Sequence, residues 1–270
     1  MRNPSGRWTL ILLVVIAVAT IAAPLFTHYD PIKISMAQRL KAPSSAHWFG
    51  TDEVGRDVLT RVLYGGRLSL AMGLMVVILA GSVGTVLGLF TGYYGGSLDE
   101  ILMRALDIVM AFPPLVLAMA VSAMLGPSLQ NAMLATAIVQ APRFTRVVRS
   151  EVLLLRDAEF VQAARATGAS DLRLLFRYIL PNCFSSILVL ATLSVGTAIL
   201  TAASLSFIGL GAQQPTPEWG AMIAGGRTYL LDAPWYPTFP GVFIFAVVLS
   251  FNVLGDGLRD ALDPRLRGRG

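Results

Sequence analysis

Long apolar runs alternate with polar segments along the whole chain. Most of these runs come close to the roughly 20 residues that a helix needs to cross the hydrocarbon core of a bilayer. A helix is the natural spanning element because it satisfies its own backbone hydrogen bonds without water. The pattern predicts an all-α, polytopic membrane protein with about six transmembrane helices. The runs cover residues 8–26, 68–90, 101–125, 129–148, 184–210 and 239–258.

Prolines and arginines interrupt two of the predicted helices. Pro113 and Pro114 lie inside the third run, and the fourth run has Pro142, Arg143 and Arg146 near its end. The fourth run is therefore the weakest of the set, because charged side chains inside a bilayer are costly.

The first run has an alternative interpretation. Arg2 and Arg7 precede it, and Ala17-Val18-Ala19 resembles the cleavage site of a secretory signal peptide. We favour a spanning helix because the apolar residues continue well past Ala19.

Composition supports a membrane protein and excludes several soluble classes. The chain is 55% hydrophobic and 14% charged, whereas soluble domains carry about 25% charged residues. Its mean hydropathy is +0.66 and its pI is about 9.7. The basic residues lie between apolar runs and form no continuous basic face, so nucleic-acid binding is not expected. A single cysteine, Cys183, and two histidines predict no disulfide framework, no metal site and no catalytic residue.

The distribution of lysine and arginine predicts the orientation of the chain. If the N-terminus is inside, 14 of the 21 basic residues lie on the cytoplasmic side. Cytoplasmic loops carry the excess of Lys and Arg in most membrane proteins. We therefore expect both termini in the cytoplasm. Arg2 and the C-terminal Arg265, Arg267 and Arg269 belong to this count.

Two connections are too long to be simple turns. The outer connection covers about residues 28–67 and the inner connection about residues 149–182. Connections longer than about 15 residues usually have structure or function of their own. No internal repeat or linker is visible, so residues 1–270 are predicted to form a single domain.

The inner connection is predicted to be a helix–turn–helix hairpin. A short helix over residues 157–167 would end at Gly168, because glycine commonly supplies the left-handed residue after a helix. Ser170 and Asp171 would begin a second helix with N-cap chemistry, and Pro181 would end it. The spacing predicts one apolar stripe, formed by Leu172, Leu175, Phe176 and Ile179.

Two interpretations of this hairpin remain open from the pattern alone. An amphipathic hairpin can lie on the lipid headgroups or against its own bundle. Alternatively, the small side chains of Ala163 and Ala164 would let the helix sit deep in the groove of a partner protein.

The hairpin resembles a known motif. Gln162-Ala163-Ala164, then Gly168, then Leu180-Pro181 is similar to the cytoplasmic coupling loop of permease subunits of binding-protein-dependent ABC importers. The family pattern is Glu-Ala-Ala, three residues, Gly, nine residues and Ile-x-Leu-Pro. This chain departs from it by having Gln162 at the Glu position and Tyr178 at the Ile position.

Four further blocks are similar to the dipeptide, oligopeptide and nickel subfamily of these permeases, and they follow one another in the order expected. The blocks are residues 47–57 running on to Arg61 and Leu70, residues 202–211, residues 217–220 and residues 255–264. The chain is therefore identified as a type I ABC importer permease-like bundle of the bacterial cytoplasmic (inner) membrane.

The resemblance implies a set of partners. A second homologous permease subunit would complete the pore, two ABC ATPase subunits would bind ATP and Mg, and an extracytoplasmic solute-binding protein would deliver the substrate. The ATPases would contact the hairpin, with these residues as the coupling site: Glu159, Gln162, Ala163, Ala164, Gly168, Arg173, Leu180 and Pro181.

The chain itself is not expected to hydrolyse ATP or to hold a cofactor. It contains no Gly-x-x-x-x-Gly-Lys-[Ser/Thr] loop, and its only lysines, Lys33 and Lys41, lie in the outer connection.

Hydroxyl groups mark the fifth run as a candidate lining of the translocation path. The residues are Thr197, Thr201, Ser204 and Ser206, with Ser194 nearby. The simpler alternative is that these hydroxyls bond to their own backbone. Two other features have simple structural explanations: close helix packing at Gly84 and Gly88, and a mutual ion pair between Arg104 and Asp107.

Two other functions compete with that of a permease. An intramembrane protease is rejected because no predicted span contains a nucleophile with a base, a His-Glu set or paired Asp residues. An ion-coupled secondary transporter is the better alternative, and Asp107 is its only candidate carboxylate away from the ends of the spans. Among substrates of the subfamily, peptides are favoured over glutathione and nickel.

Overall fold

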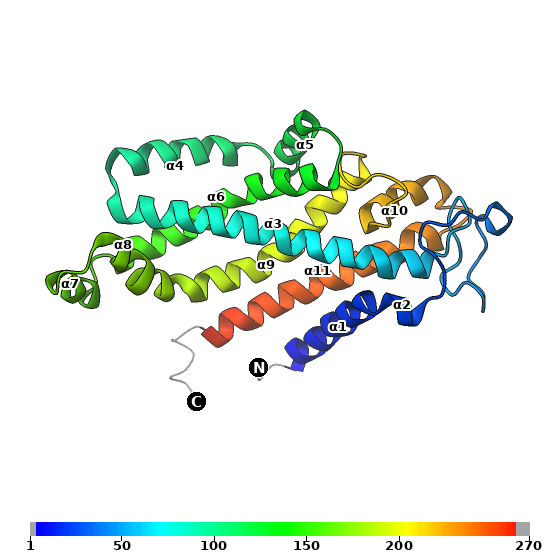
Figure 1. The fold of residues 1–270 in the computed structure, drawn as a ribbon, viewed down its shortest axis with the longest axis horizontal. Helices are drawn as coiled ribbons and strands as arrows, with labels where there is room; N and C mark the ends of the chain where they lie inside the picture. The colour runs from blue at the N-terminus through cyan, green and yellow to red at the C-terminus, as the bar shows by residue number, and fades with distance from the viewer. Residues whose placement is uncertain (1–3, 263–270) are drawn as a thin grey trace.

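The computed structural model describes residues 4–262, and these residues are almost entirely helical (Figure 1). Extended structure within them is limited to one isolated bridge between Thr51 and Asp57. The elements are α1 (Pro4–Ile21), α2 (Ala23–Phe26), η1 (Met36–Gln38), α3 (Val58–Tyr94), α4 (Gly96–Ala111), α5 (Pro114–Leu125), α6 (Leu129–Leu155), α7 (Glu159–Ala166), α8 (Asp171–Arg173), the π-helical turn η2 (Leu174–Ile179), α9 (Leu180–Phe207), α10 (Trp219–Gly226), η3 (Arg227–Tyr229) and α11 (Trp235–Leu262).

The long helices define one axis of the molecule. Helices α3, α6, α9 and α11 run along this axis and pack on one another, and α1 packs against α3 and α11. The segment before α3 lies at one end of the axis, and α7 and α8 lie at the opposite end (Figure 1). Helix α4 lies at one side of the bundle, where it contacts α3 and α6.

Each predicted run corresponds to a helix or to a pair of helices, but the runs differ in how well they would span a membrane. By length and composition, three helices qualify: α3, the continuous helix Asp171–Phe207, and α11. Helices α4 and α5 form a fourth if they count as one span, and they bend by 96° at the predicted proline break. Helix α1 is a shorter apolar helix, and α6 carries Arg143, Arg146 and Arg149 along its 27 residues.

The boundaries of the two long connections differ from the prediction. Helix α3 already begins at Val58, because the Asp57 carboxylate caps it by accepting a hydrogen bond of 2.7 Å from the Thr60 N–H. The outer connection therefore covers residues 27–57. Helix α6 continues to Leu155 and the next long helix begins at Asp171, so the inner connection is also shorter than predicted.

Three glycines bring α3 and α6 into direct contact. Gly84, Gly88 and Gly92 are buried on α3, and a Cβ atom added at Gly88 would lie 2.6 Å from the Thr145 carbonyl oxygen and 2.8 Å from Val148 Cβ. Small residues allow this close approach of two backbones. The expected packing role of Gly84 and Gly88 within the subunit is thus observed.

We expect the substitution Gly88→Ala to lower the free energy of unfolding by about 1–3 kcal/mol, because the added methyl group meets backbone atoms that cannot move aside. Gly81→Ala is the matched control on the same helix, because its nearest atom would be Phe144 Cε1 at an ordinary 3.4 Å. Thermal denaturation in detergent micelles measures both variants. Equal midpoints for the two variants would contradict the packing argument.

Candidate functional site

The hairpin formed by α7 and α8 has a tightly defined turn. Helix α7 ends in a Schellman motif, in which the Gly168 N–H donates to the Arg165 carbonyl (3.0 Å) and the Ala169 N–H donates to the Ala164 carbonyl (3.1 Å). Gly168 has a φ of +86°, which L side chains rarely adopt. The prediction that Gly168 terminates the first helix is confirmed.

One face of the hairpin belongs to an apolar core at this end of the molecule. Val161 and Ala164 of α7 are buried in the same cluster as Leu89 of α3 and Val152 of α6. The cluster also contains Leu174, Leu175 and Ile179 of η2 and Cys183 of α9. The hairpin is therefore packed against its own bundle through this face, while its other face stays uncovered.

Polar contacts fasten the hairpin to the end of α3. The Tyr93 hydroxyl donates to Asp171 Oδ1 (2.6 Å) and accepts from Arg165 Nη2 (3.0 Å). Arg156 Nη1 donates to the Gly92 carbonyl (3.1 Å). Both arms of the hairpin are thus held to the same helix end.

The prediction that Pro181 ends the second helix of the hairpin is wrong. The helix continues from Asp171 to Phe207, through η2 and the first turn of α9. In front of the proline the turn widens, and the Leu180 N–H bonds to the Leu175 carbonyl five residues back. Such π-helical turns occur as local insertions within α-helices, and Pro181 has no N–H that must be satisfied.

The widened turn also changes the predicted apolar stripe. Leu175 and Ile179 are buried as expected, but Leu172 and Phe176 are exposed, and Leu174 is buried in their place. A spacing based on 3.6 residues per turn does not hold across a π-helical turn. Phe160 and Leu154 add to the apolar side chains exposed at this end.

Most of the predicted coupling residues lie on the uncovered face. Glu159, Gln162, Ala163, Gly168, Arg173 and Pro181 are exposed, Leu180 is half-buried, and Ala164 is buried against the bundle. Gln162 Nε2 donates to the Asp157 carbonyl (2.9 Å) and so caps its own hairpin.

Three of the four candidate hydroxyls of α9 bond to their own helix. Thr197 donates to the Ser194 carbonyl (2.9 Å), Thr201 to the Thr197 carbonyl (2.8 Å) and Ser204 to the Leu200 carbonyl (2.8 Å). Ser206 is buried and its Oγ accepts a hydrogen bond from the Ala212 N–H (3.1 Å). The simpler alternative is therefore observed, although it leaves the oxygen lone pairs free to face a cavity.

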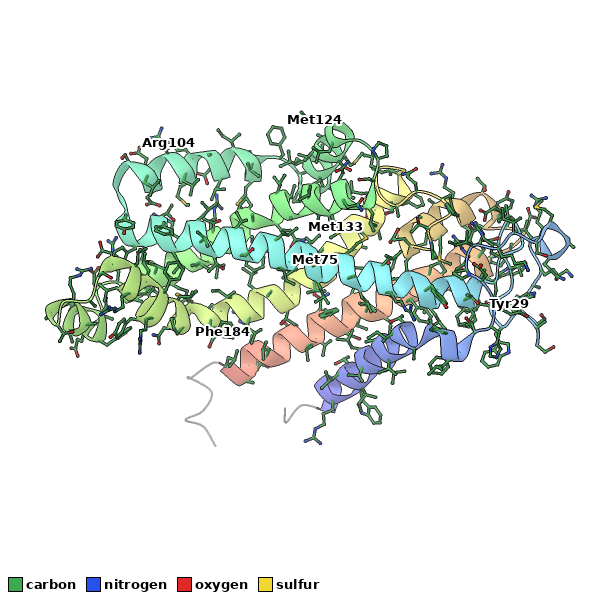
Figure 2. The ribbon with its side chains drawn as sticks, in the orientation of Figure 1. Tyr29, Met75, Arg104, Met124, Met133 and Phe184 are labelled. Atoms are coloured by element: carbon green, nitrogen blue, oxygen red, sulfur yellow. The ribbon has the colours of Figure 1, made fainter. Side chains whose placement is uncertain are left out.

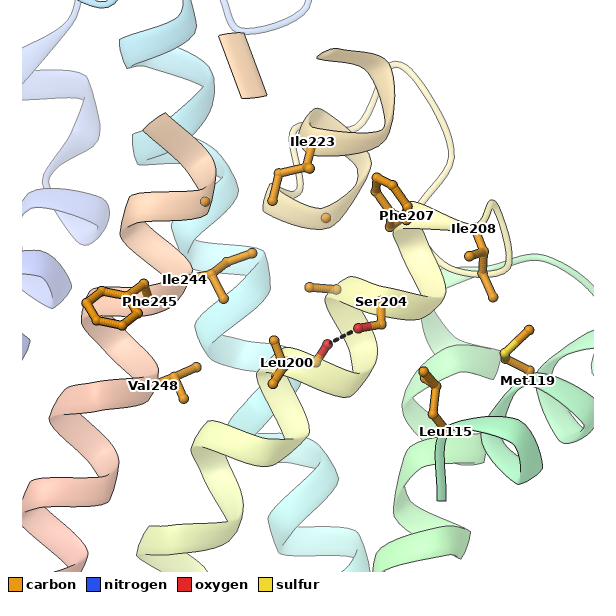
Figure 3. A pocket seen from close by; sticks show the side chains of 13 residues that line it. Leu115, Met119, Leu200, Ser204, Phe207, Ile208, Ile223, Ile244, Phe245 and Val248 are labelled. Carbon is orange, nitrogen blue, oxygen red and sulfur yellow. Dashed lines mark hydrogen bonds between the residues drawn. The ribbon is translucent and has the colours of Figure 1, made fainter. Parts of the chain in front are cut away.

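Three of these hydroxyl residues line two cavities in the described part of the chain. Thr197 and Thr201 line a cavity of about 420 Å³ between α4, α6 and α9. Ser204 lines an open apolar cavity of about 600 Å³ between α5, α9, α10 and α11 (Figure 3). Ser206 instead lines a smaller cavity of about 300 Å³ beside α10.

The expected ion pair between Arg104 and Asp107 does not form. Arg104 bonds to Glu100 one turn away (2.5 Å) and points away from the bundle (Figure 2). Asp107 pairs with Arg146 of α6. The spacing along α4 allows Arg104 to pair with Glu100 or with Asp107. Asp107 pairs with Arg146 instead, because α4 lies against α6 at this position.

The end of the molecule that carries the connection before α3 contains a buried ion network that the sequence analysis did not predict. Asp52 is fully buried, and its Oδ2 accepts from Arg56 Nε (2.6 Å) and lies 3.4 Å from Arg61 Nε. Arg61 donates to the carbonyls of Pro31 (2.7 Å) and Pro215 (3.2 Å). A buried charge without a partner is strongly destabilising, so these groups require one another. The motif at residues 47–61 was the signal in the sequence that could have indicated them.

Further contacts stabilise this segment and join it to α11. His47 Nδ1 and Asp57 Oδ2 lie 2.9 Å apart, and Phe49 stacks on Phe239 with ring centroids 3.8 Å apart. Trp235 Nε1 donates to the Thr51 carbonyl (3.2 Å). The outer segment thus connects the start of α3 to the start of α11. Within residues 4–262, no cluster of three or more His, Cys, Asp or Glu side chains could hold a metal ion.

Comparison with known proteins gives consistent similarities. Residues 84–268 match the family of binding-protein-dependent transport system inner membrane components. The chain is 51% identical to the dipeptide transport system permease protein DppC of Alkalihalophilus pseudofirmus, covering 96% of this chain and 85% of the relative. It is 49% identical to the probable D,D-dipeptide transport system permease protein DdpC of Escherichia coli, covering 99% and 90%.

A solved structure has a similar fold. The inward-facing MetNI methionine ABC transporter matches with a TM-score of 0.60 at 19% identity, over 75% of this chain and 96% of that chain. At this identity the likeness supports the fold alone, including the type I importer arrangement of helices.

The buried network predicts a large effect of Asp52→Ala, because this change leaves Arg56 and Arg61 buried without their carboxylate. Removing one partner of a buried ion pair costs about 3–5 kcal/mol. We expect a fall of that size in the free energy of unfolding, measured in detergent micelles. Asp232→Ala, at an exposed position beyond η3, should stay within about 0.5 kcal/mol of the unsubstituted protein. A mild effect of Asp52→Ala would show that the network contributes little.

Proposed function

We infer the function of this chain from the family to which it belongs, the inner membrane components of binding-protein-dependent transport systems. The chain is a permease subunit of an ABC importer, and its activity is transport rather than catalysis. We propose that it imports peptides into the cytoplasm by alternating access, with energy from ATP hydrolysis by separate subunits.

The peptide substrate is supported by the named relatives. Two chains that are about half identical over nearly all of this chain carry the names of dipeptide and D,D-dipeptide permeases. Similarity of this extent spans the helices that line the 420 Å³ cavity as well as the hairpin. A dipeptide is therefore the first substrate to test.

One observation carries the proposed coupling mechanism: the hairpin and the cavity lining share a single helix. The helix Asp171–Phe207 begins in the hairpin and reaches Thr197 and Thr201 at the 420 Å³ cavity. At 1.5 Å per residue, Thr201 lies about 45 Å along this helix from Asp171. A displacement of the hairpin by a partner would move the cavity lining as part of the same rigid element.

We further propose that the partners occupy different faces. Two ATPase subunits, which bind ATP and Mg, would grip the hairpins of the two permeases through the exposed residues around Ala163 and Phe160. The second permease would cover the open apolar cavity beside α5 and α11. A solute-binding protein would dock on the outer segment before α3.

This arrangement requires the hairpin end to be cytoplasmic. The first residues of α1 and the last residues of α11 both point toward that end (Figure 1), which agrees with two cytoplasmic termini. Arg2, Arg265, Arg267 and Arg269 of the charge count, and Asp263 and Pro264 of the last similar block, lie outside the described residues.

The ion-coupled alternative is weakened by the pairing of Asp107 with Arg146, because a proton-coupling carboxylate must be free to change its protonation.

In proteoliposomes containing the whole complex, we expect uptake of alanyl-alanine to require ATP and to continue after ionophores dissipate ion gradients. Uptake that needs a gradient but not ATP would contradict the proposal.

Gly168→Val should uncouple ATP hydrolysis from transport while the protein still inserts and assembles. A β-branched residue at a φ of +86° costs about 1–3 kcal/mol and would distort the turn that the ATPase contacts. We expect peptide uptake per ATP to fall at least fivefold in proteoliposomes, an order-of-magnitude figure from that strain.

Gly96→Val is the matched control for this measurement. Gly96 also has a positive φ of +62° and no atom within 4 Å of an added Cβ, but it is the first residue of α4, outside the hairpin. Its coupling ratio should stay close to that of the unsubstituted complex. Normal coupling in Gly168→Val, or equal loss in both variants, would count against the docking role of the hairpin.

A further inference from the structure

The 420 Å³ cavity contains polar side chains that no hydrogen bond or ion pair in residues 4–262 accounts for. It lies where α4 ends at the proline break, between α6 and α9. Arg143 and Gln140 of α6 line it together with Thr136, Thr197 and Thr201.

Neither Arg143 nor Gln140 has a polar partner in the part of the chain that the structure describes. Gln140 Oε1 is buried and accepts no hydrogen bond. The nearest carboxylate along α4 is Asp107, and it is already paired with Arg146. The Arg143 guanidinium is therefore an uncompensated positive charge at the edge of this cavity.

Arg143 lies about 21 Å along α6 from Leu129 and about 18 Å from Leu155. Its side chain is exposed in the single chain and lines the cavity. Charged side chains that line a water-filled cavity of a membrane protein usually interact with a ligand or a counter-charge. An anionic group that enters the cavity would supply that counter-charge.

The threonines of the cavity provide hydrogen-bond acceptors. Thr136, Thr197 and Thr201 each donate their hydroxyl proton to a backbone carbonyl of their own helix. Each oxygen therefore keeps only acceptor lone pairs for a ligand. The cavity thus offers donors from the Arg143 guanidinium and the Gln140 amide nitrogen, and acceptors from the threonines and from Gln140 Oε1.

We propose that Arg143 and Gln140 form a transient binding subsite for a carboxylate of the transported peptide, while the threonines accept hydrogen bonds from its N–H groups. This inference rests on the proposed import of peptides. The charge of Arg143 opposes a bare divalent cation at this position, so the subsite favours a zwitterionic or anionic cargo. The guanidinium fork matches a carboxylate geometrically.

Chemical modification tests the subsite without transport. Phenylglyoxal modifies accessible arginines, and mass spectrometry quantifies the modification of Arg143 in the complete complex in phosphatidylcholine nanodiscs. We expect alanyl-alanine to protect Arg143 and alanyl-alaninamide, which lacks the carboxylate, not to protect it. Equal modification of Arg143 with alanyl-alanine and with alanyl-alaninamide would overturn the proposal. Protection of Arg143 by phosphatidylglycerol lipids alone would also overturn it, because the site would then bind a lipid phosphate.

Transport by the reconstituted complex supplies the second readout. Arg143→Gln should lower alanyl-alanine uptake roughly tenfold to a hundredfold, because a hydrogen bond to a charged group is lost. The ATPase rate stimulated by the loaded binding protein should stay within about twofold. Arg143→Lys, which keeps the charge, should recover part of the uptake. Arg104→Gln is the matched control, since Arg104 pairs with Glu100 and points away from the bundle.

Each failure has a separate signature. Unchanged uptake by the Arg143→Gln complex would overturn the subsite. A parallel loss of ATPase activity and of the second permease from the complex would also overturn it, because Arg143 would then pair with an acidic residue of that partner. Absence of ATP-dependent peptide uptake by the unsubstituted complex, with Arg143 still protected by alanyl-alanine, would instead refute peptide import and leave the carboxylate site standing.

Discussion

Burial of Val161 and Ala164 against the long helices constrains everything that the hairpin can do. These side chains share one apolar core with Leu89, Val152 and the π-helical turn. Exposing a buried valine costs about 1.5–3 kcal/mol, and the contacts of Tyr93 with Asp171 and Arg165 add to the attachment. A partner that pulls on α7 therefore pulls on α3, α6 and α9 together, and the continuous helix Asp171–Phe207 extends that movement to the cavity lining.

The two ends of the molecule are built on different interactions. The outer end is held by buried ions, with Asp52 between Arg56 and Arg61, and by the stacking of Phe49 on Phe239. Such networks need precise geometry and lose much when one member is removed. The inner end combines an apolar core with an exposed rim at Phe160, Leu172 and Phe176. We infer that the outer end serves as a frame and the inner end as the contact surface for a moving partner.

Much of the fold follows from sequence patterns, because the bilayer imposes length and apolarity on each spanning helix. The apolar runs were predicted from this constraint, and the break at Pro113 and Pro114 and the turn at Gly168 were predicted from the residue types. The π-helical turn was not predicted, because periodicity analysis assumes 3.6 residues per turn. The continuation of the helix through Pro181 depends on that turn. The buried pairing of Asp52 and the choice of Arg146 by Asp107 depend on contacts between distant segments. The same holds for Arg143, whose lack of a partner appears only once α4, α6 and α9 are assembled.

The account depends most directly on which side of the membrane the hairpin faces. The measurement is labelling by a membrane-impermeant maleimide in right-side-out vesicles, using Ala163→Cys and Ser45→Cys in a background where Cys183 is replaced by serine. Both positions are exposed in the structure. The account predicts that the cysteine at 45 reacts at once and that the cysteine at 163 reacts only after the membrane is permeabilised. Immediate labelling at 163, with protection at 45, would contradict it, because the hairpin could then never meet a cytoplasmic ATPase.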